Sequence, residues 1–124
     1  MARVLQTKES NEALVLTKAL SRAAEYWGLS NKHLGEMIGL SEATISRLHH
    51  GAYVLEQGSK PWQLSVLLLR TYRGLDAYMG GHTENEKRWL TAKNDALGGV
   101  PMELMRNIEG LANVVQYVDY MRGQ

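Results

Sequence analysis

The chain has 124 residues, of which 44% are hydrophobic and 22% charged, and its formal net charge is +1. These values exclude a disordered chain and suit one domain, or two small helical halves that share a core. The absence of cysteine excludes disulfides and thiolate chemistry, and the sequence contains neither a signal peptide nor a membrane span, so we expect a cytoplasmic protein with no membrane partner.

The first predicted element is a helix that Gly28 ends, because apolar residues recur before it at three- and four-residue steps. They are Ala13, Leu16, Leu20, Ala23, Ala24 and Trp27. Two short helices are expected next, capped by Ser30 and Ser41. Each serine stands between a leucine outside the helix and an apolar residue inside it, which is the pattern of a hydrophobic staple. Gly39 permits the tight turn between them, since glycine tolerates positive φ, and Gly51 closes the second helix.

These two helices predict a helix-turn-helix in the segment LSNKHLGEMIGLSEATISRLHHG. Gly35 is the small residue needed where the two helices cross closely. The apolar seam between them is expected to consist of Leu34, Ile38, Leu40, Ile45 and Leu48. Two amphipathic helices of an ordinary bundle remain the alternative interpretation of the same pattern.

The helix that begins after Ser41 is the candidate recognition helix. Its candidate DNA-binding residues are those that point away from the seam, with Thr44 at the edge and the cap residue Ser41: Ser41, Glu42, Ala43, Thr44, Ser46, Arg47 and His50. Arg47 could bind a guanine, Glu42 could accept from a cytosine amine, and Ala43 could contact a thymine methyl group. The helix N-terminus and its hydroxyl groups could hold phosphates. Because Lys and Arg divide evenly about Trp62, seven on each side, non-specific attraction to DNA should be weak and binding should depend on a dimer.

The loop GAYVLEQGSKP precedes the most apolar predicted helix, from Trp62 to Met79. A helix with so little polar surface lies in a core or in an oligomer interface. We expect a homodimer or a larger oligomer, formed through Leu64, Leu67, Leu68, Tyr72 and Leu75. A boundary is expected near residue 80, dividing the chain into residues 1–80 and 81–124. Beyond it, Thr83 and Glu86 predict a capping box that opens another helix.

The last predicted helix runs from Ile108 to Arg122 and carries two apolar rows. The row expected to face the core consists of Ile108, Leu111, Val115 and Val118. The other row consists of Val114, Tyr117 and Met121, with Tyr120 beside it. One row is enough for a core, so the second indicates a partner surface, where Met and Tyr are enriched. A helix buried on both sides is the alternative.

The sequence contains no candidate catalytic or metal site. The pairs Gly80–Gly81 and Gly98–Gly99 lack the lysine and the glycine spacing of a phosphate loop. His33, His49, His50 and His82 lack the spacing of zinc ligands, and His49 and His50 are expected to meet solvent or phosphate at a helix end. No nucleophile is paired with a base. We therefore expect no enzyme, no metal and no cofactor.

The helix-turn-helix segment resembles the Xre family of bacterial repressors, whose recognition helix has a similar S-x-x-T-I-S-R run. The segment WLTAKNDALGGVPMELMRNIEGLANVVQYVDYMRG resembles the C-terminal toxin-binding domain of Xre/MbcA/ParS-like antitoxins. The matching residues are Trp89, Leu90, Asn94, Leu97, Gly98, Gly99, Pro101, Leu104, Glu109 and Gly110, followed by Val114 and Val115. The two resemblances cover most of the chain from about residue 10 onward.

The resemblance implies an all-α fold, with an N-terminal helix-turn-helix half followed by a small C-terminal helical toxin-binding domain. It implies a type II antitoxin that inhibits a RES-domain toxin that degrades NAD, and that binds promoter DNA to autoregulate its operon. The resembling antitoxins cover the NAD cleft with their C-terminal region, so the expected toxin-binding residues are Val114, Tyr117, Tyr120, Met121, Arg122, Gly123 and Gln124. Two alternatives remain: a stand-alone regulator whose C-terminal half dimerises or senses a ligand, and a helical interaction module without DNA binding.

Overall fold

The computed structural model describes the backbone of residues 8–123 and the side chains of residues 11–123. The described chain contains the helices α1 (Lys8–Trp27), α2 (Asn31–Ile38), α3 (Glu42–His49), α4 (Lys60–Tyr78), α5 (Thr83–Thr91), α6 (Pro101–Leu104) and α7 (Ile108–Arg122). Within these residues the only strand-like pairing is an isolated antiparallel bridge between Asn94 and Gly99. The predicted all-α fold is confirmed. None of the described helices is long and apolar enough to cross a bilayer.

The predicted serine N-caps are present at the start of α2 and of α3, the two helices of the predicted helix-turn-helix. Ser30 Oγ accepts from the backbone N–H of His33 at 3.0 Å, and Ser41 Oγ accepts from the backbone N–H of Thr44 at 3.2 Å. Gly39, with φ of 79°, ends α2 in the left-handed conformation, and its N–H donates to the Gly35 carbonyl. A Cβ on Gly35 would lie 2.3 Å from the Leu40 carbonyl oxygen, so only glycine fits at this crossing.

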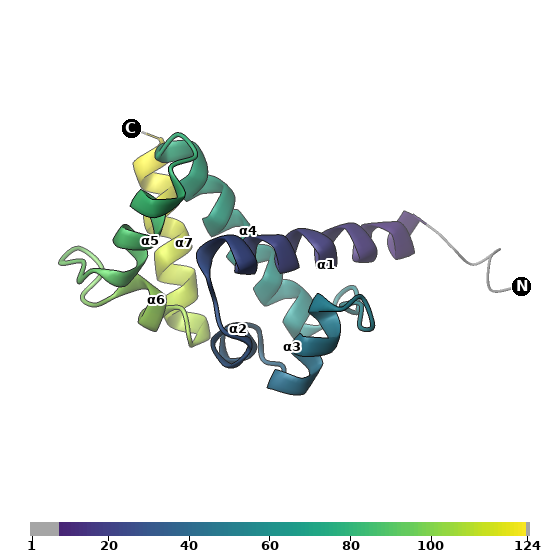
Figure 1. Cartoon of the computed structure of the whole chain (residues 1–124). Coiled ribbons are helices and arrows are strands. Elements are labelled where there is room, and N and C mark those ends of the chain that lie inside the picture. Colours follow the sequence, from purple (N-terminus) through teal and green to yellow (C-terminus); the bar gives the residue numbers. More distant parts are fainter. Residues whose placement is uncertain (1–7, 124) are drawn as a thin grey trace, which may run out of the picture.

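Helix α4 is the central element of the fold. It contacts α1, α2, α5 and α7, and its contact with α7 is the most extensive. In Figure 1, α1 lies across α4, α2 and α3 lie below it, and α5, α6 and α7 gather at one end. A Cβ on Gly74 would lie 2.7 Å from Val118 Cγ1, which shows how closely α4 approaches α7.

The position of α4 corrects part of the predicted dimer interface. Leu68 and Leu75 are buried within the chain's own core, 2% and 0% exposed, so they are not free to contact a second copy. Leu64, Leu67 and Tyr72 are half-buried. The apolar character of α4 is therefore satisfied largely by the neighbouring helices of the same chain, since a helix surrounded on several sides needs apolar residues on each of them.

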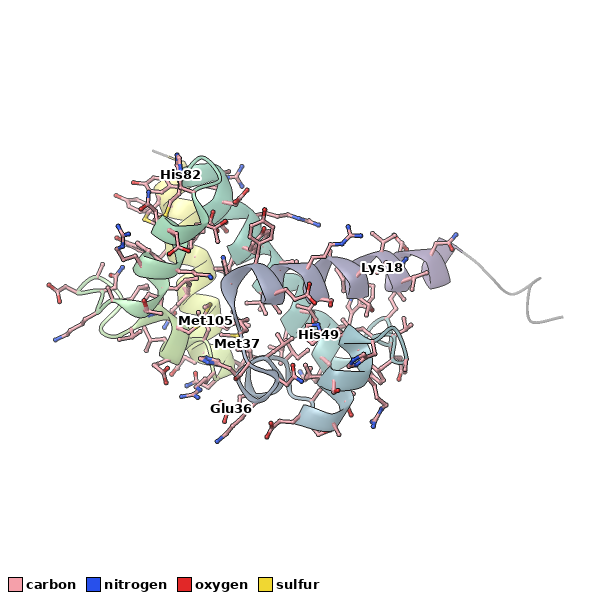
Figure 2. The ribbon with its side chains drawn as sticks, viewed as in Figure 1. Lys18, Glu36, Met37, His49, His82 and Met105 are labelled. Carbon is pink, nitrogen blue, oxygen red and sulfur yellow. The ribbon has the colours of Figure 1, made fainter. Side chains whose placement is uncertain are left out.

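One hydrophobic core joins the N-terminal and C-terminal helices. Its buried members include Trp27 of α1, Leu69 of α4, Leu90 of α5 and Leu111 of α7. Met37 of α2 and Met105, which follows α6, belong to the same cluster and are 2% and 0% exposed; both are labelled in Figure 2. The boundary near residue 80 remains a prediction, since this core extends across it.

Helix α7 has the predicted bounds but a different buried face. Its core stripe consists of Leu111, Val114, Val115 and Val118, all at most 4% exposed. These positions share one helix face, because residues three and four apart are neighbours. Ile108, the first residue of α7, is 59% exposed, so its predicted core position is wrong. Val114 is fully buried, so its predicted place on a toxin-binding surface is also wrong.

The predicted capping box of α5 is wrong as well. Thr83 is the first residue of the helix rather than its N-cap, and the N-cap residue, His82, makes no side-chain cap hydrogen bond. Glu86 points inward instead and is 1% exposed. Its Oε1 accepts from Trp27 Nε1 at 3.0 Å, which connects α5 to α1. Tertiary packing thus uses a carboxylate that the local pattern assigned to a helix end.

Candidate functional sites

The first candidate site is the polar face of α3. Ser41, Glu42, Ala43, Arg47 and His50 are exposed, as a DNA-reading face requires. The opposite face is buried, because Ile45 and Leu48 are 0% and 3% exposed and hold α3 against the core. Thr44 and Ser46 are half-buried at the edge. The structure therefore brings all seven predicted DNA-binding residues together around one short helix.

A chain of hydrogen bonds orders the side chains at the start of this face. Ser41 Oγ donates to Thr44 Oγ1 at 2.9 Å, and Arg47 Nη2 donates to the same Thr44 oxygen at 3.0 Å. Arg47 is thus held along the exposed face of α3, with further N–H groups available to a ligand. At the other end of the helix, His50 Nδ1 donates to the Ser46 carbonyl at 2.7 Å.

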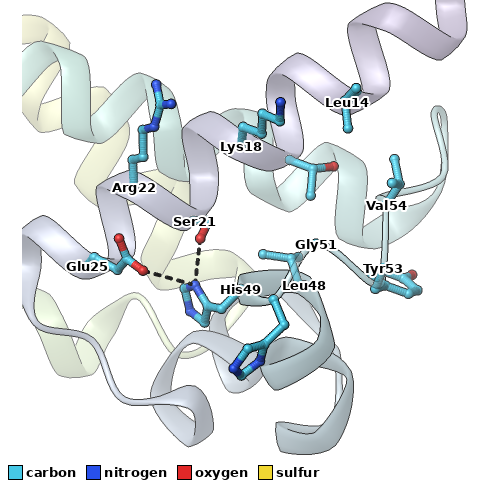
Figure 3. A pocket seen from close by; sticks show the side chains of 12 residues that line it. Leu14, Lys18, Ser21, Arg22, Glu25, Leu48, His49, Gly51, Tyr53 and Val54 are labelled. Atoms are coloured by element: carbon cyan, nitrogen blue, oxygen red, sulfur yellow. Dashed lines mark hydrogen bonds and ion pairs between the residues drawn. The ribbon is translucent and has the colours of Figure 1, made fainter.

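His49 does not point to solvent as the sequence predicted. It is half-buried, its Nδ1 lies 2.6 Å from Ser21 Oγ in a hydrogen bond, and the same nitrogen lies 3.9 Å from Glu25 Oε2. A catalytic triad needs the serine and the carboxylate on different ring nitrogens. Here both approach Nδ1, so these residues fasten the end of α3 to α1 and do not form a triad (Figure 3).

A cleft of about 400 Å³ opens beside the hydrogen bond between His49 and Ser21. It lies between α1 and the segment that follows α3, and Lys18 and Arg22 of α1 stand along it (Figure 3). The sequence prediction missed this site, because α1 and residues 48–54 meet only in the folded chain. Across the described residues, no group of three His, Asp or Glu side chains is placed to hold a metal ion.

The second candidate site is an aromatic row on the C-terminal half. The rings of Trp89 and Tyr117 stack with centroids 6.4 Å apart and planes 14° apart, and Tyr117 and Tyr120 have centroids 6.4 Å apart. Tyr120 is 63% exposed, and the other two rings are half-buried. Trp89 was not among the predicted toxin-binding residues; its alignment with Tyr117 depends on how α5 packs beside α7.

The rest of the predicted toxin-binding group is spread around the end of α7. Met121 is half-buried against the core, whereas Arg122 and Gly123 are exposed. The Arg122 side chain runs along α4, since its Cδ would lie 3.3 Å from a Cβ on Gly74. Gln124 lies outside the described residues.

Between α5 and α7 in the chain lies the segment that carries the motif residues at positions 94–110. Asn94 N–H donates to the Gly99 carbonyl at 2.8 Å, and Asn94 Oδ1 accepts from Leu97 N–H at 3.1 Å, so Asn94 closes the turn. A Cβ on Gly110 would lie 1.8 Å from the Leu104 carbonyl oxygen, so α7 can start here only with glycine at that position. These motif residues shape the backbone of this half.

Two family models match the chain, and together they account for nearly all of its described length. Residues 8–70 match the antitoxin Xre-like helix-turn-helix domain, and residues 69–123 match the antitoxin Xre/MbcA/ParS C-terminal toxin-binding domain. The chain belongs to the Xre/MbcA/ParS-like antitoxins. None of the curated proteins matches it significantly. The helix-turn-helix interpretation of α2 and α3 is thereby confirmed, and the aromatic row lies within the domain that binds toxin in this family.

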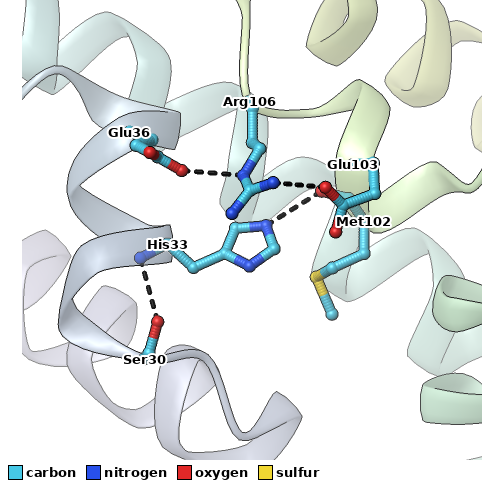
Figure 4. Close-up of polar contacts among 6 residues, drawn as sticks. All are labelled: Ser30, His33, Glu36, Met102, Glu103 and Arg106. Carbon is cyan, nitrogen blue, oxygen red and sulfur yellow. Dashed lines mark hydrogen bonds and ion pairs between the residues drawn. The ribbon is translucent and has the colours of Figure 1, made fainter.

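In this antitoxin the two family segments meet inside α4, at residues 69–70, rather than in a linker. Polar contacts also join α2 directly to the toxin-binding domain (Figure 4). His33 Nε2 donates to the Met102 carbonyl at 3.0 Å, and Arg106 Nε donates to Glu36 Oε1 at 2.7 Å. Arg106 also pairs with Glu103, so it is held between the two segments. The helix-turn-helix therefore has a fixed place on the toxin-binding domain.

Proposed function

We propose that this chain is the antitoxin of a type II pair, that its toxin is a RES-domain protein that degrades NAD, and that it represses its own operon. The observation that carries the proposal is the presence of two separate exposed sites on one shared core: the polar face of α3 and the aromatic row of α5 and α7. A protein with a DNA-reading helix acts where the genome is, which is the reason to place it in the cytoplasm.

The DNA-binding role rests on the shape and chemistry of α3. Its exposed face carries one guanidinium, one carboxylate, a methyl group and several hydroxyls, which are the groups that read base edges in a major groove. Arg47 is the residue best suited to a guanine, because it is exposed and pre-ordered by Thr44. The free N–H groups at the start of α3 suit a phosphate.

The toxin-binding role rests on the aromatic row. Tyr and Trp are the side chains that most often dominate binding energy at protein interfaces, because they bury much area with little loss of rotamer freedom. Tyr120, with its ring largely in solvent, is the anchor of the proposed contact, and Trp89 supports it through Tyr117. Arg122, Gly123 and Gln124 extend the contact toward the NAD cleft, where an anionic dinucleotide would bind.

A RES-domain toxin is favoured by the sequence resemblance, because the resembling antitoxins cover the toxin's NAD cleft with their C-terminal region. The proposed inhibition is therefore by occlusion: the aromatic row anchors the antitoxin beside the NAD cleft, and residues 122–124 enter the cleft.

A homodimer completes the proposal, with its interface moved from the centre of α4 to the groove between α1 and α4. This groove of about 370 Å³ is lined mainly by apolar atoms, including those of Val15 and Trp62. Val15 is 66% exposed, unusual for an aliphatic side chain. Glu12 and Arg73 also line the groove, and in a two-fold dimer each could pair with the other on the second copy.

The function is tested by rescue of cells that express the proposed RES-domain partner toxin. Tyr120→Ala should weaken toxin binding about tenfold or more and reduce rescue, because it removes the proposed anchor. Tyr26→Ala is the matched control: Tyr26 is 56% exposed but lies on α1. Both variants should bind operator DNA as the wild type does.

If Tyr120→Ala rescues the cells as well as Tyr26→Ala does, the aromatic row does not contact the toxin. Failure of the wild type to bind or neutralise any neighbouring toxin, with DNA binding intact, would favour the stand-alone regulator.

A further inference from the structure

The recognition helix of this antitoxin brings little positive charge to DNA. Residues 41–59 contain one arginine, Arg47, against Glu42 and Glu56, and no lysine. A DNA duplex presents a row of phosphates along each edge of its major groove. Much of the affinity of DNA-binding proteins comes from neutralising such phosphates. The cations must therefore come from another part of the fold.

The cleft between α1 and residues 48–54 supplies them. Lys18 and Arg22 line it from α1, one helical turn apart, and both are exposed. Neither forms an ion pair with another described residue, so their charges are available to a ligand. The carboxylate that lines the cleft, Glu25, stands at the end of this row beside His49 (Figure 3).

The cleft is also fixed in position relative to α3. His49 and His50, the last residue and the C-cap of that helix, form part of its wall. The bond between His49 and Ser21 fastens α1 to α3, so Lys18 and Arg22 keep their place when α3 enters a groove. Residues that flank a recognition helix meet the sugar-phosphate backbone, where they fix register and orientation.

We propose that this cleft binds a phosphate of the DNA backbone, with Lys18 and Arg22 as its cations and the His49–Ser21 bond as its positioning contact. The inference rests on the proposed DNA-binding function and deepens it. Arg47 and its neighbours on α3 read the sequence, whereas α1 supplies the sequence-independent attraction that α3 lacks. This division explains how so nearly neutral a recognition helix can serve in DNA binding.

The test measures the affinity of the full-length chain for its operator and for an unrelated duplex over a series of salt concentrations. The double variant Lys18→Gln, Arg22→Gln should make the negative slope of log K against log salt shallower by about 1 to 2, since each phosphate contact contributes about −0.9 to that slope. The double variant should bind both duplexes more weakly than the wild type, by similar factors of roughly tenfold or more at low salt. The control variant Arg88→Gln, Lys93→Gln removes the same charge from the C-terminal half and should leave the slope unchanged.

Three results would overturn the proposal. An unchanged slope in the Lys18 and Arg22 variant, with the wild type binding DNA, would contradict the phosphate-binding role of the cleft but not the DNA-binding function. Absence of binding by the wild type to either duplex would overturn the DNA-binding function and the cleft with it. Tight binding of inorganic phosphate by the wild type, with DNA binding by the double variant intact, would assign the cleft to a free anion.

Discussion

Replacing Glu86 with glutamine should stabilise the protein near neutral pH. The carboxyl group is 1% exposed, and its Oε2 has no hydrogen-bond partner among the described residues. Burial first, and then the neighbouring Asp76, raise the pKa of Glu86 from 4.5 to about 6, while the bond from Trp27 acts in the opposite direction. At 1.36 kcal/mol for each pH unit, this difference corresponds to about 2 kcal/mol of disfavoured ionisation in the folded state.

The sign of the pH dependence follows from proton binding. The folded chain holds this proton more tightly than the unfolded chain, so the contribution of Glu86 to stability is present below about pH 4.5 and is lost as the pH rises through about 6. A glutamine keeps an acceptor for Trp27 Nε1 and carries no charge at any pH. Glu86→Gln should therefore raise the free energy of unfolding at pH 7.5 by about 1–2 kcal/mol, and by much less at pH 4.5.

Urea unfolding followed by circular dichroism at both pH values measures this difference. Glu84→Gln is the matched control, because Glu84 lies on the same helix but is exposed, and it should change stability little at either pH. A Glu86→Gln variant that is less stable than the wild type at pH 7.5 would refute the reasoning. An advantage of equal size at both pH values would show that the ionisation of Glu86 is not its cause.

Three further predictions concern other parts of the chain. Arg47→Ala should weaken operator binding in gel shifts by roughly 1–3 kcal/mol without changing the unfolding midpoint, and equal affinity would remove Arg47 from base reading. Val15→Lys should give a monomer in light scattering, whereas Ile108→Lys, an equal change at an exposed site, should not; a Val15→Lys dimer would place the interface elsewhere. Gly74→Ala should destabilise the chain by about 1–3 kcal/mol in thermal unfolding, because the new methyl group would meet Val118, and an unchanged Tm would contradict the close contact.

The local signals in the sequence were sufficient to locate the helix-turn-helix. Ser30, Gly39 and Ser41 each act within a few residues of themselves, through a cap hydrogen bond or a positive φ, so their roles can be read without knowing the rest of the fold. The role of Gly35 within the first of the two helices could also be predicted, because a tight turn joins these helices and forces them to cross closely.

The errors arose where a residue's environment depends on distant elements. Thr83 and Glu86 have the spacing of a capping box, but the indole of Trp27, 59 residues away, and the burial of α5 draw the carboxylate inward. On α7, Ile108 and Val114 are equally apolar, and only packing against α4 decides which is buried. The apolar character of α4 fits either a core or an oligomer interface, and the sequence alone does not show that α7 covers much of this helix.

The candidate sites divide in the same way. The polar face of α3 could be predicted because one short helix carries it all, and periodicity separates exposed from buried positions. The aromatic row and the cation cleft could not, because Trp89 meets Tyr117, and Lys18 lies near His49, only after folding. For these sites the sequence supplies the residues and the tertiary structure supplies their proximity.

The most direct test of the proposed function is a titration of the proposed RES-domain partner toxin with the purified chain, with the rate of NAD loss as the readout. The rate should fall in proportion to added chain and reach its minimum at a fixed stoichiometric ratio, and Tyr120→Ala should shift that titration to higher concentration while Tyr26→Ala does not. An undiminished rate of NAD loss at a large excess of wild-type chain would contradict the account.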